Sequence, residues 1–245
     1  MSKLLRIDVS PRGKDWSVSK RLGDVFVSRW LKLNPGGEVC LRDISAGLPM
    51  VDLPWIAGSF NSPDKRTDEQ KAALKISDEL IAEILSSTEI LIATPMWNFS
   101  LPTMLKSWID LVVRIGLTFS ATYEGLAAGR KVWVIRASGS GYGPDSPMAA
   151  MNQFDLPLKT ILGFIGLKDV TIYGAEHTNH VEHGRFSLDA YTTEHAPDSD
   201  VAAEVAKARV SMDAYIDKHV QQVEALIAHS TLSGQMGPAT TTAGR

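Results

Sequence analysis

A first group of polar residues lies between positions 10 and 19. Ser10 follows an apolar run, and Ser17, Val18 and Ser19 open a segment with helical periodicity. The first N–H groups of a helix have no partner within it, and the helix dipole is positive at this end. Serine hydroxyls add neutral donors there, and Arg12 or Lys14 would add a positive charge. The segment therefore predicts a phosphate site, while a solvated turn between strand and helix remains the alternative.

A second group consists of Pro95, Met96, Trp97, Asn98 and Phe99. It follows a short apolar run that predicts a buried strand, and it precedes another helical pattern. Large apolar side chains next to one amide suit a flat aromatic ligand, which stacks on the former and is anchored by the latter. The same side chains would also suit a plug at the end of the core, and the loop alone leaves both possibilities open.

A third group, Ser138, Gly139, Ser140 and Gly141, follows another predicted strand. Small residues allow backbone N–H groups to approach a ligand closely. The segment therefore predicts a third ligand-binding loop, and a flexible Gly/Ser connection is its alternative.

The elements that must position these loops alternate along the chain. Apolar runs predict strands at 4–9, 38–44, 89–93, 131–136 and 167–174. Helical periodicity predicts helices at 17–33, 67–86, 103–114, 148–166 and 201–229. This order indicates an α/β protein with a doubly wound, five-stranded parallel sheet and helices on both faces. With strand order 2-1-3-4-5, the three loops meet at the carboxyl edge beside the topological switch point, where ligands bind.

The remaining segments are less regular. Residues 45–66 lack clear periodicity and predict a long loop. Thr67 and Gln70 have the spacing of a helix capping box, and Pro157 predicts a kink or break in its helix. We expect a single domain over 1–229 with an irregular insertion at about 177–200, followed by a disordered tail at 230–245.

Composition excludes several classes of protein. The 245 residues are 44% hydrophobic and 22% charged, with a net charge of -3, which gives no argument for nucleic acid or an anionic membrane as a partner. No apolar run is long enough to span a membrane, and the N-terminus is too short and too quickly charged for a signal peptide, so we expect a cytoplasmic protein. The single cysteine, Cys40, excludes an internal disulfide and is expected to be a buried structural thiol.

Three histidines, His177, His180 and His183, recur at intervals of three. On a helix, such spacing places ligands on one face and suits zinc. The segment has no strong helical pattern, however, and we expect no metal site.

Taken together, these segments resemble the FMN-dependent NAD(P)H azoreductases, the family of quinone reductases with a flavodoxin-like fold. The resemblance spans about residues 3–176. It is carried by Ser10 with 17–19, by 95–99 and 138–141, and by the segments 105–112 and 162–166. The chain departs from the family in having Trp97 where a tyrosine is common, and Ser138-Gly139-Ser140-Gly141 where the family typically has Ser-Arg-Gly-Gly.

The resemblance implies a function. Ser10, Ser17, Val18 and Ser19 would hold the FMN phosphate, residues 95–99 would pack and hydrogen-bond the isoalloxazine, and residues 138–141 would line the ring. Family members are homodimers that oxidise NADH or NADPH and then reduce quinones or azo compounds by a ping-pong mechanism. The flavin carries the chemistry, so we assign no catalytic side chain, and Phe119 would stack against the substrate.

Two other functions remain open. A flavodoxin-like electron carrier or flavin-binding regulator would bind FMN without turnover of its own, although the modest net charge is unlike that of most flavodoxins. A structural α/β protein would not bind FMN at all. Repeated turnover of NADH with a quinone separates the enzyme from both.

Overall fold

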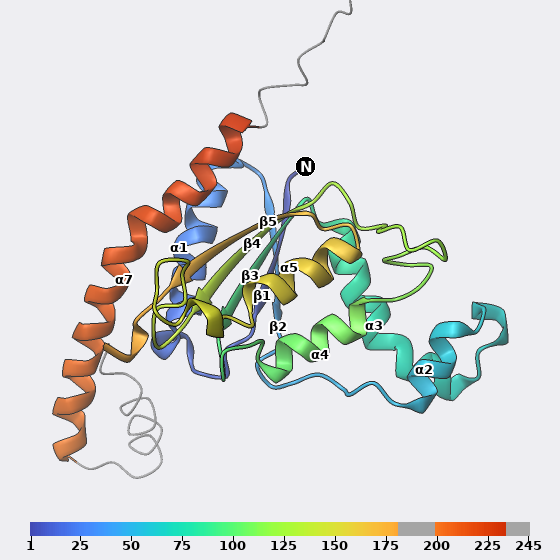
Figure 1. Cartoon of the computed structure of the whole chain (residues 1–245), viewed down its shortest axis with the longest axis horizontal. Coiled ribbons are helices and arrows are strands. Elements are labelled where there is room, and N and C mark those ends of the chain that lie inside the picture. The colour runs from blue at the N-terminus through green and yellow to red at the C-terminus, as the bar shows by residue number, and fades with distance from the viewer. Residues whose placement is uncertain (181–198, 234–245) are drawn as a thin grey trace, which may run out of the picture.

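A five-stranded parallel sheet forms the centre of the chain in its computed structural model, which describes residues 1–180 and 199–233 (Figure 1). The strand order is β2-β1-β3-β4-β5, so the predicted fold class and order are confirmed. The strands are β1 (Lys3–Asp8), β2 (Glu38–Asp43), β3 (Glu89–Pro95), β4 (Lys131–Ala137) and β5 (Asp169–Ala175).

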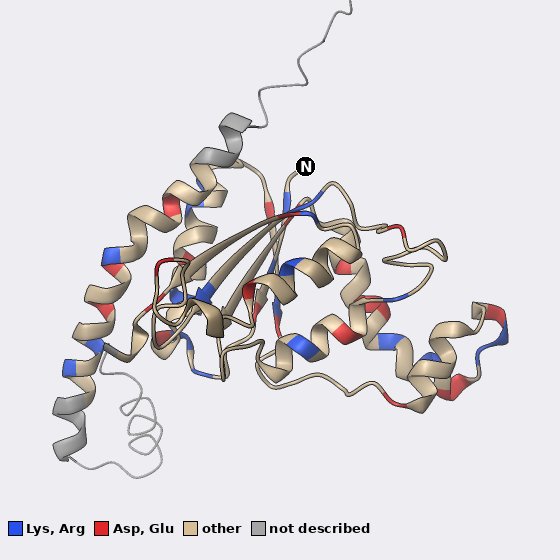
Figure 2. Cartoon of the chain, in the orientation of Figure 1, with Lys and Arg blue, Asp and Glu red and all other residues tan. Residues whose placement is uncertain are grey.

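Helices cover both faces of this sheet (Figure 1). One face packs against α1 (Val18–Leu33) and α7 (Ser199–Ser233), through a core that includes Trp30, Trp133 and Met212. The other packs against α3 (Asp68–Ser86), α4 (Thr103–Val112) and α5 (Asp155–Phe164). Charged side chains lie mainly on helices and loops, and the central strands carry few (Figure 2). Burial on both faces explains the nearly continuous apolar runs of β1, β3 and β4, whereas β2 and β5 are partly exposed.

Two predicted helix starts are confirmed in detail. Ser17 caps α1, its Oγ accepting a hydrogen bond from the Lys20 N–H at 3.3 Å. Thr67 and Gln70 form a reciprocal capping box at α3, with both hydrogen bonds at 3.2 Å. Such caps satisfy N–H groups that have no partner within the helix.

The prediction of a loop over 45–66 was wrong. This segment contains α2 (Leu53–Phe60) and a 3-10 turn at Pro63–Lys65. Asp52 caps α2 by accepting the Trp55 N–H at 2.9 Å, and Pro54 lies in the first turn, where a missing N–H costs no helical bond. The helix has only eight residues and is apolar over much of its surface, so the segment shows little periodicity.

The expected kink at Pro157 is also corrected. The region 148–166 is divided into a 3-10 turn at Ala149–Met151 and the helix α5. Pro157 lies in the first turn of α5, where no preceding helical carbonyl needs its N–H. The break therefore comes before the proline.

The last helix extends beyond its predicted bounds of 201–229. It runs to Ser233, so the first residues of the predicted tail are helical, while 234–245 lie outside the described residues. Of the predicted insertion, the structure describes a 3-10 turn at Thr178–His180 and the start of α7, but not 181–198.

Two smaller findings concern other expectations from the sequence. Cys40 is a free thiol that is partly buried against the core, rather than fully buried as predicted. Within the described part of the chain, no helix has the length and apolar character needed to cross a bilayer.

Candidate functional site

The three predicted loops begin at the same level of the sheet edge. Hydrogen bonds continue the parallel ladders past the strand ends, from Val9 N–H to the Ala93 carbonyl at 3.0 Å, from Met96 to Ala137 at 2.7 Å and from Ser138 to Ala175 at 3.0 Å. Because these bonds tie each loop to the end of the next strand, the loops leave the sheet side by side.

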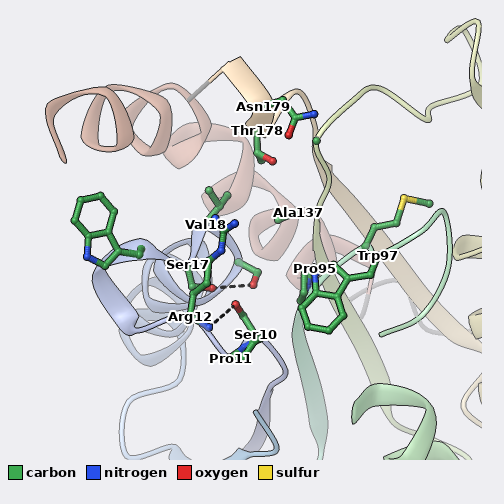
Figure 3. A pocket seen from close by; sticks show the side chains of 14 residues that line it. Ser10, Pro11, Arg12, Ser17, Val18, Pro95, Trp97, Ala137, Thr178 and Asn179 are labelled. Atoms are coloured by element: carbon green, nitrogen blue, oxygen red, sulfur yellow. Dashed lines mark hydrogen bonds between the residues drawn. The ribbon is translucent and has the colours of Figure 1, made fainter. Parts of the chain in front are cut away.

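A cavity of about 260 Å³ lies between them (Figure 3). It adjoins β1 and β3, where the chain order of the strands reverses, as predicted. The cavity is lined by Ser10, Pro11, Arg12, Trp16, Ser17, Val18, Ser19, Pro95, Met96, Trp97, Ala137, Gly139, Thr178 and Asn179.

One side of the cavity carries hydroxyl groups. Ser10, Ser17 and Ser19 are all buried, and the Ser17 and Ser19 hydroxyls are 3.3 Å apart. The Ser10 Oγ accepts the Arg12 N–H at 3.3 Å. The N–H groups of Val18 and Ser19 belong to the first turn of α1 and need partners from outside the helix. This side therefore offers a cluster of donors at the positive end of a helix dipole.

Arg12 adds a cation to this cluster. Partial burial lowers the pKa of its guanidinium, and no described carboxylate forms an ion pair with it. A partly desolvated cation without a counterion is stabilised by any anion that binds beside it. Together, Arg12 and the serines offer hydrogen-bond donors and a positive charge, which suit an anion such as a phosphate group.

The opposite side is apolar and aromatic. Pro95, Met96 and Trp97 line it, and Figure 3 shows Pro95 and Trp97 across the cavity from Ser10 and Arg12. Met96 is buried, whereas the Trp97 side chain is 40% exposed. An exposed indole facing this cluster of donors provides a surface for stacking a ring.

Asn98 and Phe99 form the tip of this loop and do not line the cavity. They occupy the centre of a tight turn, in which the backbones of Trp97 and Ser100 exchange hydrogen bonds of 3.1 and 2.9 Å. Both have positive φ values, 47° and 69°, which is uncommon for residues other than glycine. Phe99 makes an edge-on contact with Tyr142, with ring centroids 6.1 Å apart.

The third predicted loop contributes only Gly139 to the cavity lining. Ser138 is buried, and its Oγ donates to the Ser140 carbonyl at 3.0 Å. Ser140 and Gly141 lie outside the lining. The loop therefore presents backbone to the cavity rather than hydroxyl groups.

Thr178 and Asn179 are lining residues that sequence reasoning missed. They follow β5, in the segment predicted as an irregular insertion, and no motif marked them. Their N–H groups donate to the Ser138 and Gly139 carbonyls at 3.0 and 3.2 Å, which continues the pairing of β4 with β5 into the loops. The predicted position of the fifth strand beside the fourth is the one sequence signal that places this segment near the loop after β4.

Phe119 does not reach the cavity lining. Its ring packs against Phe164 at 4.9 Å and lies nearly parallel to Tyr123 at 6.4 Å. The structure thus places it in an aromatic cluster that is separate from the residues around the cavity.

The zinc alternative is not tested, because His183 lies outside the described residues. Residues 1–180 and 199–233 contain no group of three or more side chains arranged to hold a metal ion.

An open parallel sheet with an anion site and an aromatic loop at its switch point defines the class of nucleotide-binding α/β proteins. Comparison with known proteins agrees with this assignment. A family model described as a flavodoxin-like fold matches residues 2–196. The chain is 43% identical over 190 residues to an FMN-dependent NADH:quinone oxidoreductase of Trichormus variabilis, covering 76% of this chain and 91% of that protein.

A second relative, an FMN-dependent NADH:quinone oxidoreductase of a Jannaschia species, is 40% identical over 192 residues, with 78% of this chain and 94% of that protein covered. The crystal structure of an azoreductase from Bacillus anthracis superposes with a TM-score of 0.70 over 92% of this chain and all of that one, at 22% identity. The chain belongs to the flavodoxin-like family of FMN-dependent NADH:quinone oxidoreductases.

Proposed function

We propose that the chain is an FMN-dependent oxidoreductase that uses NADH or NADPH to reduce quinones or azo compounds. The names of its relatives support FMN, NADH and a quinone. The azo compound is suggested by the name of a structural neighbour whose likeness extends only to the fold.

One observation carries this proposal. The cavity joins a phosphate site, built from three buried hydroxyls and a cation, to an aromatic surface on its opposite side. A flavin mononucleotide has a phosphate and a flat ring separated by a flexible chain, so it matches both sides at once. Neither side alone would distinguish FMN from another phosphate or another ring.

The residues of the chain bind and orient the cofactor. Ser10, Ser17, Ser19 and the first N–H groups of α1 hold the phosphate, and Arg12 neutralises it. Bound FMN supplies a ring that takes a hydride from the nicotinamide and passes it on to the acceptor. Trp97 contributes an aromatic surface to the ring side, and the protein needs no side chain as acid or base.

The remaining predicted residues have roles in the same proposal. The turn at Asn98 and Phe99 orients the loop that faces the ring, while Ser138, Ser140 and Gly141 shape the backbone beside it. The role predicted for Phe119, stacking against the substrate, stays a prediction, because its aromatic cluster is separate from the cavity lining.

We also propose that two copies of the chain form a homodimer. Residues 50–60, which include α2, expose large apolar side chains: Met50 is 84% exposed, Leu53 75% and Phe60 75%. Grouped apolar side chains of this size mark an interaction surface more often than free surface. A cytoplasmic location stays a prediction.

The visible absorbance spectrum of the purified protein tests the function. After incubation with FMN and desalting, we expect retained flavin bands that bleach when NADH or NADPH is added without oxygen. They should return when a quinone such as menadione is added. Retained flavin that neither nicotinamide reduces would favour the electron carrier. Absence of retained flavin in several buffers would contradict the proposed site.

A further inference from the structure

The loops that follow β4 and β5 are in close contact. A Cβ added at Gly139 would lie 2.6 Å from the amide of Asn179, and one at Gly141 would lie 2.8 Å from the His177 ring. A Cβ at either glycine would therefore force the end of the Asn179 or His177 side chain to shift, which shows how closely the second loop approaches. Because Gly139 and Asn179 line the cavity, the contact between these loops sets the position of one cavity wall.

Arg136 lies beneath this contact. It is the last residue but one of β4, and its side chain is only 2% exposed. One guanidinium nitrogen donates to Glu176 Oε1 at 2.7 Å and the other to Asp155 Oδ1 at 2.8 Å. The guanidinium lies against the backbone of β5, since a Cβ at Gly174 would come within 2.8 Å of it.

Glu176 connects Arg136 to both loops. Its Oε1 also accepts the Tyr142 N–H at 2.9 Å, so a single carboxylate oxygen joins the guanidinium to the loop after β4. Its backbone carbonyl accepts the Tyr215 hydroxyl of α7 at 2.6 Å. Thr178 and Asn179 follow in the chain after one intervening residue, His177.

We propose that Arg136 is a positioning residue for the flavin site, which holds the wall formed by Gly139, Thr178 and Asn179 through Glu176. This inference rests on the proposed function. Arg136 itself does not line the cavity, and so it acts on a ligand only through the two loops. Removal of the cation would leave the carboxylates of Glu176 and Asp155 without their shared partner, and their repulsion would displace Glu176 from the Tyr142 N–H.

Arg114 provides a matched control, because it is also 2% exposed and also pairs with a carboxylate, that of Asp78, at 2.5 Å. In both residues Nε is buried without a partner among the described residues. Arg114 does not line the cavity, and among the described residues its side chain is hydrogen-bonded to Ser77 and Asp78 of α3 rather than to the cavity loops. Loss of either arginine should destabilise the protein, but only loss of Arg136 should alter the site.

The experiment compares the full-length wild type with Arg136→Met, Arg136→Lys and Arg114→Met. The dissociation constants of FMN and of riboflavin are measured by flavin fluorescence. Hydrogen exchange over residues 138–143 is followed in the apoprotein. For Arg136→Met we expect about tenfold weaker binding of both flavins by the same factor, because the phosphate side is untouched, and faster exchange at Tyr142. Arg136→Lys should recover part of both effects, and Arg114→Met should change neither affinity by more than about twofold.

Several results would overturn the inference. One is wild-type affinity in Arg136→Met, and another is equal weakening in Arg114→Met. A third is unchanged exchange over 138–143. If Arg136→Met does not fold, Glu176→Ala removes the carboxylate that joins Arg136 to the Tyr142 N–H and must show the same two effects. Failure of the wild type to bind FMN would instead contradict the proposed function.

Discussion

At the scale of single residues, Arg12 distinguishes a phosphate site from a general polar turn. Its charge-assisted hydrogen bonds to a phosphate are worth about 1.5–3 kcal/mol. We therefore expect Arg12→Gln to weaken FMN binding by about tenfold or more and riboflavin binding by less than twofold, as measured by flavin fluorescence titration.

Lys14→Gln is the control for Arg12. Lys14 lies in the same loop, but its side chain is 73% exposed, it pairs with Asp24, and it does not line the cavity. We expect nearly wild-type affinity for both flavins. Equal losses for FMN and riboflavin in Arg12→Gln would place the phosphate elsewhere.

Two substitutions at Asn98 separate the effect of its backbone conformation from the effect of its side chain. Its φ of 47° costs alanine about 1–2 kcal/mol but costs glycine little. If the amide binds the flavin, both Asn98→Ala and Asn98→Gly should weaken FMN binding or slow its reduction. If Asn98 only forms the turn, Asn98→Gly should behave as the wild type. Stopped-flow reduction by NADH and FMN titration of the two variants decide between these roles.

The residues of the site could be predicted only in part. Ser10, Ser17, Val18 and Ser19 follow from the local chemistry of a strand–helix junction, and the structure brings them together. Thr178 and Asn179 could not be found in this way, because no motif marks them. Their backbone hydrogen bonds to the loop after β4 place them at the cavity.

At the scale of elements, α7 is joined to the sheet by a titratable contact. Nδ1 of His219 is hydrogen-bonded to the Tyr173 hydroxyl of β5, and its ring packs against Tyr215 at 4.5 Å. Burial lowers the pKa of His219, with a smaller contribution from Lys218, and burial raises the pKa of Tyr173 to about 12. The phenol therefore stays protonated, and a neutral imidazole can accept its hydrogen, whereas an imidazolium can only donate to the phenol oxygen.

This contact predicts a dependence on pH. Because the folded pKa of His219 is below its unfolded value of about 6.5, its contribution is present above that pH and is lost as the pH falls through the folded value. We expect the melting temperature of the wild type to fall by about 2 °C more than that of His219→Gln between pH 8 and pH 5. His177→Gln, which changes an exposed histidine, should follow the wild type. Parallel curves for all three proteins would contradict the assignment.

The elements themselves were mostly predictable, and the errors have local causes. The strands at 89–93 and 131–136 are buried on both faces, so their apolar runs are unambiguous. The helix α2 was missed because it is short, although Asp52 and Pro54 mark its start. Pro157 led to the prediction of a kink because the sequence alone does not distinguish a proline in the first turn of a helix from one in its middle.

At the scale of the whole molecule, α7 adds a helix beyond the segment that the family model matches. The family model ends at residue 196, before α7 begins at Ser199. Nevertheless Met212, Ile216 and Val223 of α7 are buried in the same cluster as Trp133 of the sheet. The helix therefore completes one face of the core, consistent with the prediction of a single domain over 1–229, which stays a prediction.

The apolar surface of α2 leads to the last prediction, which concerns assembly. We expect the wild type to sediment at twice its chain mass of 26.7 kDa. The double variant Leu53→Glu/Phe60→Glu should shift the equilibrium to the monomer, because a dimer interface would have to bury two unpaired carboxylates from each copy. Val210→Glu is the matched control, since Val210 is 69% exposed on α7, away from α2 (Figure 1). Analytical ultracentrifugation over a range of concentrations distinguishes the outcomes. A monomeric wild type, or a double variant that stays dimeric, would exclude α2 as the surface that joins two copies.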